Sequence, residues 1–181
     1  MVRIYGNRQI KTLPGLQTRP TTARVREALF NRWQHHLQGC HWLDLCAGSG
    51  SMGAEALCRE AAVVYGIEQT GEACRIIRQN WQSVAKPTQT FQVLRGDVIK
   101  RLMKLTGQSF DLIYFDPPYD GGLYEGVLAA IATHHILKPT GELAVEHHPK
   151  KTLSLPAKLT TCHTRTYGNT KLTFVQAATT L

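Results

Sequence analysis

The apolar residues of this chain fall into short continuous runs, and the runs are separated by segments in which apolar residues recur at helical spacing. A short run without alternation is typical of a strand that is buried on both faces, as in a parallel sheet. We expect five such strands, at 42–47, 62–67, 91–95, 110–115 and 141–146. The regular exchange of strand and helix predicts an α/β fold with a mostly parallel sheet.

Helices are expected in the intervals between these runs. A short helix should reach residue 57, another should begin at Val98, and a longer one should span 123–137. The clearest stripe belongs to the helix between the second and third strands. Its core positions are Cys74, Ile77, Trp81 and Val84.

Both ends of the chain carry further elements. Residues 2–13 predict a β-hairpin that turns at Gly6-Asn7, and a threonine cap then opens a helix that should end near residue 39. The core stripe of this helix is Val25, Leu29 and Trp33. At the other end, Gly168-Asn169 joins a strand that ends at Tyr167 to a strand over 171–177. The chain should therefore finish in an antiparallel pair.

Composition narrows the choice of partners and of compartment. The 181 residues carry a formal net charge of +8, which favours a polyanionic partner such as nucleic acid, although a merely soluble basic protein has a similar balance. Five cysteines without C-x-x-C spacing indicate reduced thiols. No apolar run resembles a membrane span or a signal peptide, so we expect a cytoplasmic protein, or an organellar one after import.

Three histidine pairs, His35-His36, His134-His135 and His147-His148, raise the question of a metal site. Adjacent side chains point apart on a helix or a strand, and no cysteine thiolate lies at zinc-binding spacing from them. We therefore expect no metal site.

The fourth strand ends in Asp116-Pro117-Pro118-Tyr119, at the sheet edge where open α/β folds bind ligands. The prolines stop the strand and restrict the backbone. Asp116 and the Pro117 carbonyl could accept the N–H bonds of an exocyclic amine and so activate its nitrogen for methylation. Tyr119 offers a stacking face for an extruded base. The alternative is a proline turn beside an ordinary surface aspartate.

The first strand leads directly into a glycine-rich loop, residues 48–53, that opens a helix. Glycines permit a tight turn and the close approach of a ligand to the backbone. Glu68 ends the second strand, where an acid can bind ribose hydroxyls. Dinucleotides and S-adenosylmethionine both fit these features, and Asp44 favours S-adenosylmethionine because the amino acid part of that cofactor is cationic. Asp97 could bind the adenine amino group or cap the following helix.

Six cations that precede the first central strand are candidates for phosphate contacts: Arg3, Arg8, Lys11, Arg19, Arg24 and Arg26. The first three lie on the predicted hairpin, whose alternative role is a solvated, charged edge. The other three lie off the apolar stripe and near a helix start. Cations at that end oppose the helix dipole, so anion binding explains them better than stability does.

Together these motifs resemble the class I, Rossmann-like S-adenosylmethionine-dependent methyltransferases. More narrowly, the chain resembles the RsmD family of small-subunit ribosomal RNA guanine-N2 methyltransferases. The resemblance covers nearly the whole chain and rests on residues 19–27, 44–53, 116–119 and 167–170. Ala23 departs from the family, where a polar or acidic residue is expected, and so does Cys46, where an aromatic residue is commoner.

The resemblance implies a seven-stranded sheet in a single domain, with residues 1–39 extending a catalytic core of residues 40–181. It implies that a monomer methylates N2 of one guanine in 16S rRNA, within the partly or fully assembled small subunit. Asp116 and Pro117 would be the acceptors for the amine, and Tyr119 would stack on the base. The cofactor site would comprise Asp44, Cys46, Gly48, Gly50, Gly53, Glu68, Asp97, Val98 and Asp116.

Other classes of protein explain part of the pattern. A nicotinamide-dependent dehydrogenase would account for the glycine loop and Glu68, but not for residues 116–119 or the basic N-terminus. An RNA-binding protein without activity would account for the charge alone. A DNA amine methylase shares the tetrapeptide but usually needs a target-recognition domain, for which this chain leaves no room. Another RNA base remains an alternative target.

Overall fold

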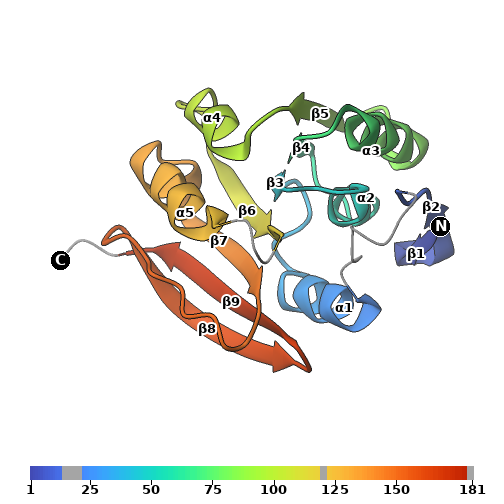
Figure 1. The fold of residues 1–181 in the computed structure, drawn as a ribbon. Helices are drawn as coiled ribbons and strands as arrows, with labels where there is room; N and C mark the ends of the chain where they lie inside the picture. Colours follow the sequence, from blue (N-terminus) through green and yellow to red (C-terminus); the bar gives the residue numbers. More distant parts are fainter. Residues whose placement is uncertain (14–21, 119–121, 179–181) are drawn as a thin grey trace.

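A seven-stranded sheet forms the centre of the molecule, with its strands in the order β5-β4-β3-β6-β7-β9-β8 (Figure 1). The structure is a computed structural model that describes residues 1–13, 22–118 and 122–178. Strands β3 to β7 run parallel, and β9 lies antiparallel to both β7 and β8. The bounds are β3 (His41–Leu45), β4 (Val63–Glu68), β5 (Thr90–Arg95), β6 (Phe110–Phe115), β7 (Leu137–His147), β8 (Leu159–Tyr167) and β9 (Thr170–Ala177). The predicted α/β fold and its C-terminal antiparallel pair are confirmed.

Helices cover both faces of the sheet. One face packs against α1 (Ala23–Arg32), α2 (Ser51–Cys58) and α3 (Gly71–Val84), and the other against α4 (Val98–Met103) and α5 (Leu123–Thr133). Successive residues of each strand pack alternately into the two apolar cores, because neighbouring side chains of a strand point to opposite faces. The predicted stripe of α3 is buried at all four positions. No helix among residues 1–13, 22–118 and 122–178 is long and apolar enough to cross a membrane.

The predicted N-terminal hairpin is present as β1 (Val2–Ile4) and β2 (Arg8–Ile10), joined by the short 3-10 turn η1 (Tyr5–Asn7). It docks on the domain through Ile4 and Ile10, which are buried. Asn80 of α3 fastens it further, because its amide accepts from Lys11 N and donates to Lys11 O, both at 2.9 Å. The same amide nitrogen lies 2.8 Å from Ser49 O, so the hairpin is tied to the glycine loop.

Two helices are shorter than their apolar patterns predict. Helix α1 ends at Arg32 instead of near residue 39, because the chain turns over residues 33–36 and then buries Leu37. Helix α5 ends at Thr133 because His135 adopts a left-handed φ of 52° and Ile136 N bonds back to Ile131 O at 3.0 Å. β7 therefore begins at Leu137, four residues before the predicted start.

Candidate active site

Four carboxylates gather at the edge of the sheet where the parallel strands end. Asp44 lies near the end of β3 and Glu68 ends β4, while Asp97 and Asp116 follow β5 and β6. Cys46 lies among them. Burial raises the pKa of its thiol to about 12, and the charges of all four carboxylates act in the same direction. The structure thus brings together the four acids that the sequence separates by up to 72 positions, Asp44 to Asp116.

The glycine loop is fixed to two of these acids. Gly48 N donates to Glu68 Oε2 at 2.9 Å, and Gly53 N donates to Asp44 Oδ2 at 3.0 Å. Gly48 has a φ of +56°, and a Cβ atom built on it would meet no atom within 4 Å. The surface above Gly48 is therefore open to a ligand that approaches the backbone.

Gly50 and Gly53 are required for a different reason, namely the indole of Trp81. A Cβ atom on Gly50 would lie 2.7 Å from Trp81 Nε1, and one on Gly53 would lie 2.3 Å from Trp81 Cζ2. The indole also donates to Gly50 O at 2.8 Å. The indole on α3 fills the space on the Cβ side of both glycines, so packing requires glycine at these two positions.

Asp44 is a buried acid without a cationic partner in the described part of the chain. Its side chain is 1 % exposed, and Gly53 N donates the hydrogen bond that it accepts. Burial raises the pKa of Asp44 to about 8, and the charge of Glu68 adds to this while the Gly53 bond opposes it. A cation that entered the site would favour the ionised form of this carboxyl.

Glu68 and Asp97 hold backbone groups at the same edge. Glu68 Oε1 accepts from Gln69 N at 2.7 Å and from Thr70 N at 3.1 Å, in addition to the Gly48 bond on its other oxygen. Asp97 Oδ1 accepts from Lys100 N at 2.9 Å and so caps α4, one of the two roles predicted for it. Val98, the first residue of α4, is buried.

Asp116 and Pro117 come directly after β6, with Asp116 half-buried and Pro117 buried. Burial, followed by the charges of Glu146 and Asp44, raises the pKa of Asp116 well above its usual value. Tyr119, the predicted stacking residue, lies outside the described residues.

Glu146 is an acid that the sequence interpretation missed. It lies on β7, is 5 % exposed, and accepts a hydrogen bond from the Tyr114 hydroxyl of the neighbouring strand β6. The available signal was the same one that identified Glu68, an acid at the carboxyl end of a buried apolar run. It adds a negative charge beside Asp116.

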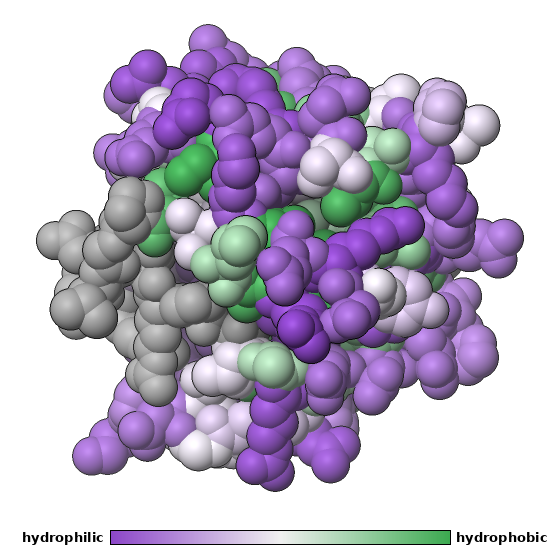
Figure 2. Space-filling view, turned by 90° about the vertical axis from the view of Figure 1, so that its right-hand side faces the viewer, coloured by the Kyte–Doolittle hydropathy of each residue, from purple (hydrophilic) through white to green (hydrophobic). Residues whose placement is uncertain are grey.

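The predicted phosphate-binding residues of the hairpin are exposed, but two of them already bond to the protein. Arg8 Nη1 lies 3.0 Å from Cys58 Sγ, and Lys11 Nζ lies 3.1 Å from Gln79 Oε1. Arg3 is exposed as well. Figure 2 shows that the side of the molecule with this hairpin is mainly hydrophilic, with small apolar areas between polar side chains.

The arginines of the first helix differ sharply in exposure. Arg24 is exposed, whereas Arg26 is buried, with its Nε 2.7 Å from Glu55 Oε2 and its Nη2 2.7 Å from Arg3 O. The prediction that Arg26 contacts phosphate is therefore wrong. The hairpin and α2 cover its side of α1, which a single-helix pattern could not show. Arg19 lies outside the described residues.

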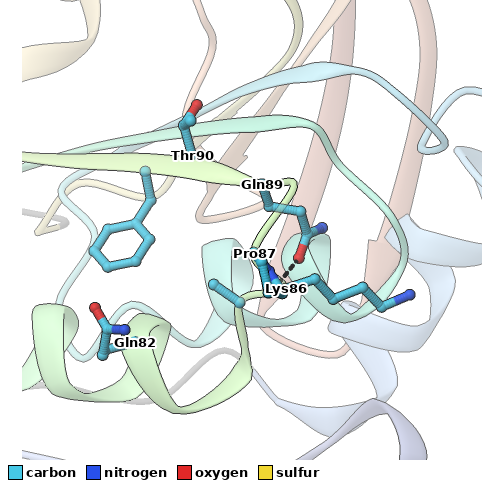
Figure 3. Close-up of a pocket in the computed structure, with 7 residues that line it drawn as sticks. Gln82, Lys86, Pro87, Gln89 and Thr90 are labelled. Atoms are coloured by element: carbon cyan, nitrogen blue, oxygen red, sulfur yellow. Dashed lines mark hydrogen bonds between the residues drawn. The ribbon is translucent and has the colours of Figure 1, made fainter.

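The hollow drawn in Figure 3 lies away from these acids. It has a volume of about 420 Å³ and is lined by the end of α3, the following turn and the start of β5. Thr90 on its wall pairs with Val63, the first residue of β4, so the hollow opens at the amino edge of the sheet. Since none of the four carboxylates lines it, we place the candidate site at the opposite, carboxyl edge.

Within the described ranges, no group of three or more histidine, cysteine, aspartate or glutamate side chains is arranged to hold a metal ion. His147, from the third histidine pair, is buried and has structural partners. Its ring nitrogens lie 2.8 Å from Thr173 Oγ1 and 3.0 Å from His148 O.

Comparison with known proteins gives concordant matches. The family model described as "Conserved hypothetical protein 95" matches residues 2–176. The Haemophilus influenzae protein named ribosomal RNA small subunit methyltransferase D is 30% identical over 166 residues, which cover 91% of this chain and 86% of that protein. The putative rRNA methyltransferase YlbH of Bacillus subtilis is 32% identical over 142 residues, 77% of each chain. The solved structure of the putative methyltransferase yhhF from Escherichia coli superposes with a TM-score of 0.83 at 28% identity, over 97% of both chains.

Proposed function

Since this chain belongs to the RsmD family of methyltransferases, we propose that it transfers a methyl group from S-adenosylmethionine to N2 of a guanine in 16S rRNA. The observation that carries this proposal is the set of four carboxylates at the carboxyl edge, in which Asp116 is followed by Pro117. The names of the relatives support rRNA as the substrate. The guanine and its N2 atom rest on the motif chemistry.

The residues present fit S-adenosylmethionine. Burial and neighbouring negative charges disfavour the ionised forms of Asp44 and Asp116. The positive charge of the cofactor would favour these ionised forms. Glu68 stands at a strand end where it can accept from ribose hydroxyls, because a carboxylate has room for about four hydrogen bonds and this one accepts three. The open surface at Gly48 gives access to the backbone. When bound, the cofactor supplies the methyl group to be transferred.

Asp116 and the Pro117 carbonyl position the acceptor amine. The lone pair of a guanine N2 is delocalised into the ring, and two acceptors on its N–H bonds concentrate electron density on the nitrogen. Pro117 restricts the backbone, so these acceptors keep their directions before the substrate arrives. Asp116 must be ionised for this role, and the cationic cofactor favours that state.

The transfer itself requires alignment more than strong base catalysis. The cofactor would supply the methyl group for N2, and the nitrogen that receives it would have to lose one proton. Asp116, already bonded to the amine, is placed to take that proton and pass it to water. Most of the acceleration comes from positioning the two reactants. Tyr119 stacks on the extruded base in this proposal.

The RNA contacts of the N-terminal segment belong to the same proposal. Arg3, Arg8, Lys11, Arg19 and Arg24 are the remaining candidates once Arg26 is removed. Arg8 and Lys11 would exchange their present partners for phosphates. An R8A/K11A variant tests them, since each lost phosphate contact lowers the log–log salt slope of RNA binding by about 0.7–0.9.

Mass spectrometry of small-subunit rRNA from cells that lack this protein tests the proposed reaction. We expect one N2-methylguanosine to be lost, to return with the wild-type protein, and to stay absent with D116A. An unchanged rRNA, or the loss of a different modified nucleoside, would contradict the assignment.

A further inference from the structure

The C-terminal hairpin projects beyond the edge of the sheet that carries the candidate site. Phe115, which precedes Asp116, lies in one row with Val145 and Thr173 across three strands. Tyr167, at the end of β8, lies three residues beyond this row because it pairs with the first residue of β9. Three strand spacings separate β6 from β8, which is roughly 15 Å across the sheet. The tip of the hairpin (Figure 1) is therefore within reach of a nucleotide or two from the site.

Tyr167 faces the same side of the sheet as the site. Its ring packs against the core cluster that contains Tyr114 and Leu172. Tyr114 bonds to Glu146, and the charge of Glu146 acts on Asp116. A substrate that reaches Asp116 from this side passes over the face on which Tyr167 lies.

Two guanidinium groups converge on the Tyr167 ring. Arg24 from α1 and Arg165 from β8 each have Cζ 5.9 Å from its centroid. Both arginines are exposed, and Tyr167 is half-buried. We call these three residues the Tyr167 platform. Within residues 1–13, 22–118 and 122–178, no carboxylate forms an ion pair with Arg24 or Arg165. Two like charges beside one ring repel each other, and a bound anion would relieve this repulsion.

Arg32, a third arginine on this face, differs because its guanidinium is paired within the protein. Arg32 forms a two-pronged bond with Glu142, at 2.6 and 2.9 Å, and lies 4.4 Å over the Phe174 ring. Arg24 and Arg165 have no such carboxylate among the residues that the structure describes. The surrounding edge strand is also uncovered, because every side chain over 160–166 is exposed. The Tyr167 platform therefore presents two positive charges and part of an aromatic ring to a binding partner.

We propose that the Tyr167 platform holds the RNA strand next to the target base, with Arg24 and Arg165 on phosphates and Tyr167 against an unpaired base. The net charge of +8 and the pairing of cations with an aromatic ring are the features by which proteins hold single-stranded nucleic acid. This inference rests on the proposed function, since it takes the target base to be held at Asp116.

Binding of deproteinised small-subunit rRNA across a salt series tests the platform. R24A/R165A should lower the log–log salt slope by about 1.4–1.8, the value for two lost phosphate contacts. R75A/K104A is the matched control, because it removes the same charge from exposed positions on α3 and at the end of α4. Its slope should stay near that of the wild type. Y167A should bind about 5- to 100-fold more weakly than Y167F, because only Y167F keeps a stacking face.

Equal slopes for R24A/R165A and the control would overturn the proposal. A defect that appears only on assembled subunits, and not on deproteinised rRNA, would also overturn it and indicate an acidic ribosomal protein as the partner. If R24A/R165A does not fold, R24Q/R165Q keeps most of the side-chain length and removes the charge.

Methyl transfer from labelled cofactor to assembled small subunits, measured in parallel with the wild-type protein, separates this proposal from the proposed function. A wild-type protein that transfers no methyl group but binds rRNA through the platform refutes the proposed reaction alone. A wild-type protein that methylates while R24A/R165A keeps its slope refutes the platform alone.

Discussion

Acidic side chains at the two edges of the central sheet have opposite electrostatic surroundings. At the amino edge, Asp111 accepts from Lys138 Nζ and from His41 N, both at 2.8 Å. Burial acts to raise the pKa of Asp111, but these bonds outweigh it and lower that pKa below its usual value. At the carboxyl edge, burial raises the pKa of Asp44 and of Asp116, and no cation in the described ranges pairs with either.

The contrast indicates that Asp111 stabilises the fold, whereas Asp44 and Asp116 are arranged to interact with a ligand. An acid whose pKa is lowered by folding adds stability above its unfolded pKa, whereas an acid whose pKa is raised removes stability as it ionises. Sites with uncompensated charge are where function is expected, because evolution has accepted a cost to stability there. The contrast therefore predicts different outcomes for matched substitutions at the two edges.

The largest effect is expected for D116A. It removes one positioned acceptor for the target amine, so the rate of methyl transfer should fall about a hundred- to a thousand-fold. Cofactor affinity should fall much less than the rate, because Glu68, Asp44 and the surface at Gly48 remain. Calorimetry and single-turnover kinetics measure the two quantities, and a parallel loss of both would contradict this division of roles.

D44N should make the free protein more stable and the cofactor complex weaker. The folded pKa of about 8 lies above the unfolded value of 3.8, so the folded state binds more protons and wild-type stability falls as pH rises between these values. The amide keeps an acceptor for Gly53 N and carries no charge. At pH 8 the free energy of unfolding of D44N should exceed that of the wild type, and the gap should close toward pH 4.

Urea unfolding across this pH range, with cofactor titration at pH 8, tests D44N. We expect affinity to drop about ten- to a hundred-fold, since a charge-assisted contact is lost. A variant that is less stable than the wild type at pH 8 would show that Asp44 serves the fold, as Asp111 does.

E68A should weaken cofactor binding by roughly 1–3 kcal/mol if ribose hydroxyls lose their acceptor. The same change also frees three backbone N–H groups of the glycine loop and the β4–α3 turn. E68Q is the control, because it keeps one carbonyl oxygen for these groups. If the affinity of E68A matches that of the wild type, Glu68 only shapes the loop.

The smallest effect is expected for D111N at the amino edge. It removes the attraction of Lys138 while leaving an acceptor for His41 N, so the free energy of unfolding should fall by about 1 kcal/mol at pH 7. The stability from Asp111 is present above its unfolded pKa and is lost as pH falls through its lowered folded pKa, so the deficit should disappear in acid. The rate of methyl transfer should not change. A loss of activity in D111N would contradict the placement of the active site at the carboxyl edge.

The sequence was sufficient for features that depend on one segment at a time. Apolar runs located the parallel strands, and an acid at the carboxyl end of a run identified Glu68 and Asp116 as site candidates. Features that depend on contact between distant segments were not predictable. The burial of Arg26 depends on the docked hairpin, and the convergence of Arg24 with Arg165 depends on the α1–β8 contact.

The same limit applied to the helix ends. Helical periodicity continues past Thr133, but the left-handed φ of His135 ends the helix because the chain must enter β7 at Leu137. Periodicity shows which face of a helix is apolar. It does not show where the backbone must leave the helix to enter the next strand.

The packing of Trp81 restricts which substitutions the chain can accept at several positions. Its indole lies against three glycines, since a Cβ atom on Gly66 of β4 would be 2.6 Å from Trp81 Cη2, and Gly50 and Gly53 are crowded in the same way. A mutation of any one glycine collides with the ring, and a smaller residue at 81 leaves a void beneath all three. We therefore expect substitutions at these four positions to depend on one another, and a smaller residue at 81 to permit side chains at 53 and 66. A glycine signature in this family can persist through packing alone, whatever ligand the loop above it comes to hold.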